Sequence, residues 1–158
     1  MRSRKKTLKT ILWVVVGILA LFLIVGLFNP IVDEDGRVEL NLQYEIGALD
    51  EQGKYKSSET TIYSEMFDCK GLNVELDFDA EVTYKIFYYD ADGKFVFVSE
   101  ELDDDYNVEN SVEEAVQARI VIYPVSDDED FKLNFFTKIK YANQLTVKVY
   151  EDQKTVEE

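Results

Sequence analysis

Clustered acidic side chains are the most visible chemistry in this 158-residue chain. Calcium binds six to eight oxygen ligands, and a folded domain that brought two such clusters together would supply them. The alternative is that the clusters are solvated turns, because Asp90-x-Asp92-Gly93 places its glycine too early for a helical calcium loop. The candidate calcium ligands are Asp77, Asp79, Asp90 and Asp92, and further acidic clusters lie at 103–105 and 127–130.

Few catalytic arrangements are compatible with this composition. Two carboxylates could serve a glycosidase, but among 32 acidic residues a suitable pair is expected by chance. The chain has no His, which excludes Ser-His-Asp triads, Cys-His dyads and His-containing zinc sites. Cys69 is the only cysteine, so no intramolecular disulfide can form, and we expect a buried, inert thiol. The sequence predicts a protein that is not an enzyme and has no cofactor, with calcium left open.

Aromatic residues that point away from the core are the other candidate ligand-binding residues. If the even-numbered residues of the apolar run at 81–89 point inward, Phe87 and Tyr89 point to the opposite face. Tyr63 and Phe67 are expected to do the same on their own strand. Exposed rings stack on sugars or anchor a protein partner. The alternative is that these rings cover a second small core or are shielded by the loop at 100–117.

Alternation of apolar and polar residues dominates the chain after residue 36 and predicts antiparallel strands with one face toward a core. Turns with Gly53 and Gly93 predict hairpins at 50–53 and 89–95. A capping-box spacing at 111–114 predicts one helical turn, and we expect no long helix after residue 32. The pattern predicts a β-sandwich or barrel of about eight strands, at 37–46, 60–67, 71–79, 81–89, 94–99, 118–123, 131–135 and 144–150.

Three segments, 44–50 followed by Gly53, 81–95 and 118–122, carry a resemblance to a known family. Their order resembles the galactose-binding-like, jelly-roll modules that occur as carbohydrate-binding domains and in phage tail or bacterial surface proteins. The resemblance implies a jelly-roll-like sandwich over most of 37–150 in a bacterial-type protein. It also implies non-catalytic binding of sugar or protein, but it transfers no individual ligand residue.

An apolar stretch at 10–32 contains no charged side chain. A bilayer core of about 30 Å needs roughly 20 apolar residues in a helix, so this stretch is long enough to cross a membrane. The alternative is a cleaved signal peptide, but its apolar core is usually about 7 to 15 residues and ends in small residues. The sequence therefore predicts a retained, single-pass signal-anchor.

The charges on either side of this stretch predict its orientation. Five basic residues and no acid precede it, whereas Asp33, Glu34 and Asp35 follow it directly. Positively charged flanks stay in the cytoplasm, so we place the N-terminus inside and residues 33–158 outside the cell membrane. This outer part holds all 32 acids and 12 of the 17 basic residues, a net charge of −20, which predicts no nucleic-acid partner.

These observations give a predicted organisation and function. The expected parts are a cytoplasmic basic tail at 1–9, the transmembrane helix at 10–32, a linker at 33–36, an extracytoplasmic β-sandwich at 37–150 and a polar tail at 151–158. We expect a membrane-anchored binding module for cell-surface glycan or wall polymer. The alternative is a structural or assembly partner of another envelope protein. A groove lined by exposed aromatic rings favours the first, and an apolar patch or unpaired sheet edge favours the second.

Overall fold

The computed structural model describes residues 13–17, 31–107 and 114–151, and it divides into two units, Met1–Ile31 and Val32–Glu158. Residues 13–17 of the first unit are helical. Among the described residues, none of the helices combines the length and the apolar character that a membrane crossing requires. The predicted span at 10–32 lies mostly outside the described residues, as do the tails at 1–9 and 152–158 and most of the helical turn expected at 111–114.

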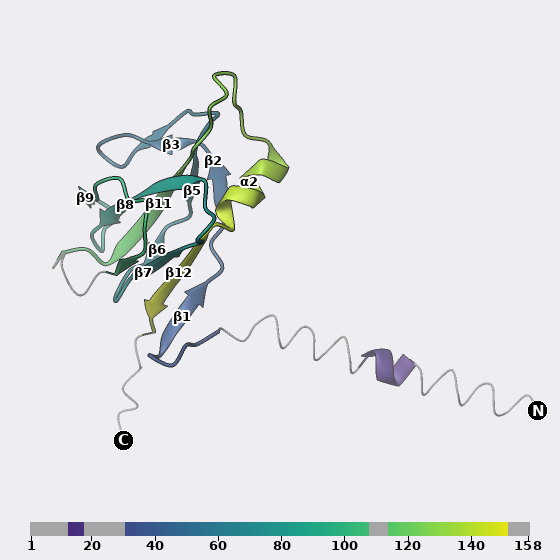
Figure 1. Ribbon diagram of the computed structural model, residues 1–158. Helices are drawn as coiled ribbons and strands as arrows, with labels where there is room; N and C mark the ends of the chain where they lie inside the picture. The colour runs from purple at the N-terminus through teal and green to yellow at the C-terminus, as the bar shows by residue number, and fades with distance from the viewer. Residues whose placement is uncertain (1–12, 18–30, 108–113, 152–158) are drawn as a thin grey trace, which may run out of the picture. The chain divides into compact units, whose positions relative to one another are not determined.

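The second unit consists of two antiparallel β-sheets, with a short third hairpin (Figure 1). This confirms the predicted all-β, antiparallel sandwich. The smaller sheet has the order β1 (Arg37–Leu40), β12 (Leu145–Tyr150), β7 (Asn73–Leu76) and β10 (Tyr106–Asn107). The larger sheet has the order β2 (Tyr44–Ile46), β5 (Ile62–Ser64), β11 (Gln117–Pro124), β8 (Val82–Tyr89) and β9 (Phe95–Val98). A further short strand of this sheet, β6 (Phe67–Asp68), also pairs with β11. The separate hairpin consists of β3 (Ala48–Leu49) and β4 (Tyr55–Lys56).

The main core lies between the two sheets, as alternating strands require. Ile86 of β8 and Ile120 of β11 are directly paired and both fully buried. Val74 and Val147, paired between β7 and β12, belong to the same core cluster from the opposite sheet. Each sheet therefore contributes one apolar face, and burial of these side chains is the main source of stability in a domain without disulfides.

A second, smaller apolar cluster covers part of the outer face of the larger sheet. Phe87, Tyr89 and Val121 alternate with the core residues of β8 and β11, so they point away from the main core. Leu49 of the β3–β4 hairpin packs onto them. The Tyr89 hydroxyl donates a hydrogen bond of 2.9 Å to the Gly53 carbonyl in the same hairpin. The hairpin therefore excludes water from this face.

Three turns share one sequence pattern, Asp-x-x-Gly followed by Lys or Arg. In each turn the Asp carboxylate accepts hydrogen bonds from the backbone N–H groups two and four residues later. The glycine has a positive φ, as a turn with a bulge requires. Two of these turns, at 50–54 and 90–94, confirm the predicted hairpins. The third, at 33–37, covers the expected linker at 33–36, and Val32 pairs with Val38 across it.

The strand predicted at 131–135 is wrong, because helix α2 (Phe135–Ala142) begins there. Asn134 caps the helix: its side chain accepts hydrogen bonds from the N–H groups of Phe136 and Thr137, and Thr137 bonds back to the Asn134 N–H. This capping box fixes the helix start. The apolar alternation at 131–135 therefore runs across a loop and the first helical residue.

Two other predicted strands are shorter or divided. The alternation at 37–46 contains β1 and β2, which lie in different sheets, so the chain crosses between layers at 41–43. The segment at 60–67 likewise divides into β5 and the start of β6. At 71–79 only Asn73–Leu76 forms a strand, and Phe78, expected on the apolar face, is fully exposed.

Gly71 and Gly93 form a matched pair for testing backbone strain. Both have positive φ, +61° and +75°, but a Cβ at Gly71 would lie 1.8 Å from the Tyr150 ring, whereas a Cβ at Gly93 would meet nothing within 4 Å. We expect Gly93→Ala to cost roughly 1–2 kcal/mol of unfolding free energy from the left-handed backbone alone. Gly71→Ala should cost roughly 1–3 kcal/mol more, because the ring must move. Denaturant unfolding followed by circular dichroism measures both values, and equal costs would contradict the packing of Tyr150 on Gly71.

Candidate ligand pocket on the larger sheet

A polar pocket of about 280 Å³ lies on the outer face of the larger sheet, beside the second apolar cluster. Strands β2, β5 and β11 are neighbours in this sheet, and Glu45, Tyr63 and Val121 lie side by side across them. Arg119 lies two residues before Val121 and therefore points to the same face. The lining side chains come from these three strands and the residues that flank them: Gln43, Glu45, Tyr63, Glu65 and Arg119.

The two glutamates of the pocket are held by hydrogen bonds. The Tyr63 hydroxyl donates to Glu45 Oε2 at 2.8 Å, and the Gln43 backbone N–H donates to Glu65 Oε1 at 3.0 Å. The bond to Glu45, followed by partial burial, raises the pKa of Tyr63 above its ordinary value, and nearby Arg119 opposes this increase. Tyr63 is therefore a protonated donor at neutral pH. Each carboxylate keeps further lone pairs for a ligand.

Arg119 is the least satisfied polar side chain of the pocket. Its guanidinium lies over the Tyr63 ring, 5.7 Å from the ring centre. Its Nε is buried without a hydrogen-bond partner, and the described residues place no carboxylate within ion-pair distance of it. A buried, unpaired N–H group costs free energy, so a ligand that accepts a hydrogen bond from this guanidinium would be stabilised here.

An aromatic pair forms one side of this region. Tyr55 of β4 lies beside Tyr63, with ring centres 5.9 Å apart and planes tilted by 59°. Tyr55 is 63% exposed, so most of its ring is accessible to a ligand. Strand β4 therefore brings a free aromatic face next to polar groups that come from the larger sheet, a combination typical of sites that bind sugars through stacking and hydrogen bonds.

The structure separates the four aromatic residues that the sequence singled out. Tyr63 lines the pocket. Phe87 and Tyr89 are buried in the outer cluster, the alternative in which these rings cover a second small core. Phe67 is buried in the main core, on the face opposite to the expected one. Phe67, Phe87 and Tyr89 therefore have no free face on which a ligand could stack.

Sequence reasoning missed most of the pocket. Arg119 carried a usable signal, because it is the only charged residue of β11, an otherwise largely apolar strand. In the sequence, Gln43 and Glu45 are recognisable only as residues on the polar face of an alternating strand. Glu65 belongs to no motif that would indicate a binding site. Tyr55 comes from a two-residue strand, which is too short to be recognised by periodicity.

Two of the four predicted calcium ligands, Asp77 and Asp90, act as acceptors in turns, and the backbone N–H groups of the other two, Asp79 and Asp92, donate to them. Asp77 Oδ1 accepts the N–H of Asp79 at 3.2 Å, and Asp90 Oδ1 accepts the N–H groups of Asp92 and Lys94. Within the described ranges, no three residues among Asp, Glu and Cys form a group that could hold a metal ion. The structure thus gives the carboxylates of Asp77 and Asp90 a local role in turns.

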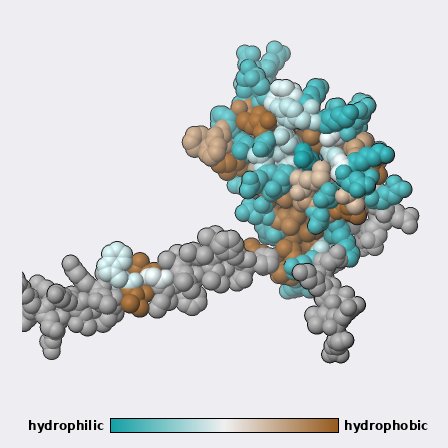
Figure 2. All heavy atoms as spheres, turned by 180° about the vertical axis from the view of Figure 1, so that it is seen from behind, coloured by the Kyte–Doolittle hydropathy of each residue, from teal (hydrophilic) through white to brown (hydrophobic). Residues whose placement is uncertain are grey.

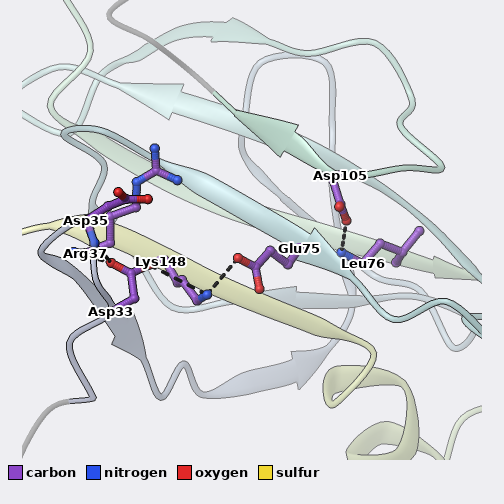
Figure 3. A network of polar contacts seen from close by, with 7 residues as sticks. All are labelled: Asp33, Asp35, Arg37, Glu75, Leu76, Asp105 and Lys148. Carbon is purple, nitrogen blue, oxygen red and sulfur yellow. Dashed lines mark hydrogen bonds and ion pairs between the residues drawn. The ribbon is translucent and has the colours of Figure 1, made fainter.

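A second polar cluster lies on the smaller sheet and joins three of its segments (Figure 3). Lys148 of β12 forms a 2.7 Å hydrogen-bonded ion pair with Glu75 of β7 and a 3.8 Å pair with Asp33 of the first turn. Asp105 Oδ1 accepts the Leu76 N–H at 2.8 Å. Because two carboxylates already neutralise the ammonium group, this cluster connects strands and is a poor candidate for ligand binding.

Cys69 is buried between the sheets, as expected. Burial raises the pKa of its thiol to about 11. A thiol with so little thiolate at neutral pH is a poor nucleophile, so Cys69 contributes packing to the main core.

Comparisons with known proteins identify no relative of the chain: no family model, no curated protein and no solved structure matches it. The resemblance to galactose-binding-like modules therefore stays a prediction from the sequence. What the pocket binds has to be argued from its own residues.

Calcium removal should leave the stability of the domain unchanged. Asp77 and Asp90 already bind backbone N–H groups, so a chelator has no structural ion to withdraw at these turns. We expect the same thermal midpoint with EDTA as with added calcium, measured by circular dichroism. A midpoint that rises with calcium, and does so less after Asp90→Asn, would show that these carboxylates hold the ion after all.

Proposed function

We propose that this protein is a membrane-anchored, extracytoplasmic binding module for cell-surface glycan or wall polymer, without catalytic activity. The observation that carries the proposal is the polar pocket lined by two glutamates, Tyr63 and Arg119, in which the Arg119 guanidinium lies over the Tyr63 ring and its buried Nε has no hydrogen-bond partner. A sugar presents vicinal hydroxyls that both donate and accept hydrogen bonds, and one apolar ring face. The pocket and its edge offer matching partners for each of these groups.

The pocket and its edge suit a sugar in three ways. The Arg119 guanidinium supplies N–H donors, and Glu45 and Glu65 supply acceptors, each already oriented by one hydrogen bond. Tyr55 supplies an exposed ring face beside them. Hydrogen bonds fix the orientation of a polar ligand, and stacking adds contact area at little cost in side-chain entropy.

The negative charge of the pocket and of the surrounding domain indicates which class of glycan can bind. Two carboxylates and one guanidinium leave the pocket with one net negative charge, within an outer part of net charge −20. A strongly anionic polymer would be repelled by this field, so a neutral or amine-bearing glycan fits best. Binding without catalysis is part of the proposal, and it is supported by the hydrogen bonds that both glutamates already accept within the pocket.

The membrane anchor belongs to the same proposal. The uncharged stretch at 10–32 and the five basic residues before it support a single-pass helix with a cytoplasmic N-terminus. We further assign the sandwich to the jelly-roll-like class, on the resemblance of the segments at 44–53, 81–95 and 118–122. The second candidate function, a structural partner of another envelope protein, is favoured by an exposed apolar surface on α2.

Substitutions in the pocket should weaken glycan binding without unfolding the domain. We expect Arg119→Lys and Tyr55→Ala each to raise the Kd by about tenfold or more, because the first loses the forked donors and the second the stacking surface. The measurement is titration of neutral and amino-bearing cell-surface oligosaccharides into the full chain in detergent micelles.

Phe78→Ala is the matched control for Tyr55→Ala, because Phe78 is an exposed ring that follows β7 of the smaller sheet, whereas Tyr55 packs beside Tyr63 of the pocket. It should leave the Kd unchanged. The assignment of the pocket would be refuted by sugar binding that survives both pocket substitutions. Failure of every neutral and amino-bearing oligosaccharide to bind the native chain would refute the glycan proposal itself.

The orientation can be tested separately. A protease added to intact cells should remove a tag placed after Glu158, because the outer domain is accessible from outside. A tag placed before Met1 should stay protected and serves as the control. Protection of both tags, or loss of only the N-terminal one, would contradict the proposed topology.

A further inference from the structure

The pocket on the larger sheet holds charges of both signs that do not neutralise one another. Glu45 and Glu65 line it together with Arg119. The ion pairs within the described part of the chain are formed by other side chains, so neither glutamate lies within ion-pair distance of the guanidinium. Opposite charges in one pocket attract each other, so the surrounding structure must hold these apart.

Three contacts orient the charged groups of the pocket. The Tyr63 hydroxyl donates to Glu45 at 2.8 Å, and the Gln43 backbone N–H donates to Glu65 at 3.0 Å. The Arg119 guanidinium lies over the Tyr63 ring, 5.7 Å from the ring centre, and its buried Nε has no hydrogen-bond partner. Each charged group is thus positioned by a neutral neighbour, which leaves its charge available to a ligand.

An irregularity in strand pairing lies beside these groups. The pairing of β5 with β11 and that of β6 with β11 differ by one residue in register, so the three residues at 64–66 face the two at 119–120. Ser64 is fully buried in this bulge, and its hydroxyl accepts the Ile120 N–H at 2.9 Å. A bulge changes the direction of nearby side chains and is common next to functional sites. The glutamate and the arginine of these two segments are therefore placed by the bulge.

We infer that the pocket binds a zwitterionic sugar, a glycan unit with a free amine and a carboxylate on one ring, and this inference rests on the proposed glycan-binding function. An ammonium group at the glutamates and a carboxylate at Arg119 add ion pairing to the hydrogen bonds that hydroxyls make. The opposite charges of the pocket lie beyond ion-pair distance of each other, which fits an amine and a carboxylate on opposite sides of one sugar ring.

Ligands with a single charge match the pocket less well. A sugar with an amine alone leaves the guanidinium of Arg119 without a charged acceptor. A sugar with a carboxylate alone lies beside two glutamates and in the field of an outer part of net charge −20. Figure 2 shows hydrophilic side chains over much of one face of this domain, in agreement with that charge. A zwitterion has a partner for each charge and adds no net charge.

The test uses four sugars that differ only in these two charges. They are the methyl glycosides of glucose, glucosamine, glucuronic acid and 2-amino-2-deoxyglucuronic acid. Each is titrated at neutral pH into the full chain, held in a non-ionic detergent without a sugar headgroup, and calorimetry gives the Kd. We expect the zwitterionic sugar to bind about fivefold more tightly, or better, than either singly charged sugar, because both of its charges find partners.

The four Kd values separate this inference from the proposed function. If the zwitterionic sugar binds no more tightly than the glucosamine or glucose glycoside, the inference is wrong and glycan binding stands. If none of the four sugars binds, the inference is also wrong, and the oligosaccharide titration described above decides the proposed function by itself. This comparison uses the native chain, so it does not depend on whether any variant folds.

Variants assign each charge to its partner. Arg119→Gln should abolish the gain in affinity from the carboxylate and keep the gain from the amine, whereas Glu65→Gln should reduce the gain from the amine alone. Glu39→Gln is the matched control, because it removes an exposed carboxylate from β1 of the smaller sheet and should leave all four Kd values unchanged. Circular dichroism checks that each variant is folded. Equal effects of Glu65→Gln and Glu39→Gln would attribute the preference to overall charge and contradict the assignment to the pocket.

Discussion

The two-faced alternation of β11 is the constraint on which the rest of the structure depends. This strand lies between β5 and β8 in the larger sheet, so both of its edges are paired. Its even-numbered residues, such as Ile120 and Ile122, fill the core between the sheets, and its odd-numbered residues, Arg119 and Val121, form the outer face. A shift of one residue in its pairing would exchange the two faces and put a guanidinium into the core. Core and pocket are therefore specified by the same register.

The pocket exists because the outer face of the larger sheet is only partly covered. The β3–β4 hairpin closes the region above Phe87 and Tyr89 and leaves the part toward β2 open. Tyr63 lies between the covered and the open part of this face. Its ring packs against the apolar cluster, and its hydroxyl donates a hydrogen bond to Glu45. The guanidinium of Arg119 lies above that ring, where the aromatic face compensates part of its lost hydration. A cation held this way is ordered before any ligand arrives, which lowers the entropic cost of binding.

How far the sequence predicts this protein can be argued from particular residues. The strands at 82–89 and 145–150 and the turn at Gly93 were predictable, because alternation and turn chemistry are local signals. Helix α2 was not, because its Asn134 cap lies within the apolar alternation at 131–135, which favours a strand. Of the pocket, only Tyr63 was predicted. Glu45, Glu65 and Arg119 come together through pairing between strands as much as 56 residues apart, as in the Ile120–Ser64 hydrogen bond, and a single sequence does not reveal such pairing.

The first turn, at 33–37, is closed by hydrogen bonds and precedes β1 directly. A flexible linker of the same length would have an end-to-end distance of about 11 Å. Asp33 is held instead by the hydrogen bonds that its carboxylate accepts from the backbone and by its ion pair with Lys148. If the anchor proposed above ends at Val32, β1 follows it after a closed turn, and the pocket would meet only ligands that come within about one domain diameter of the membrane.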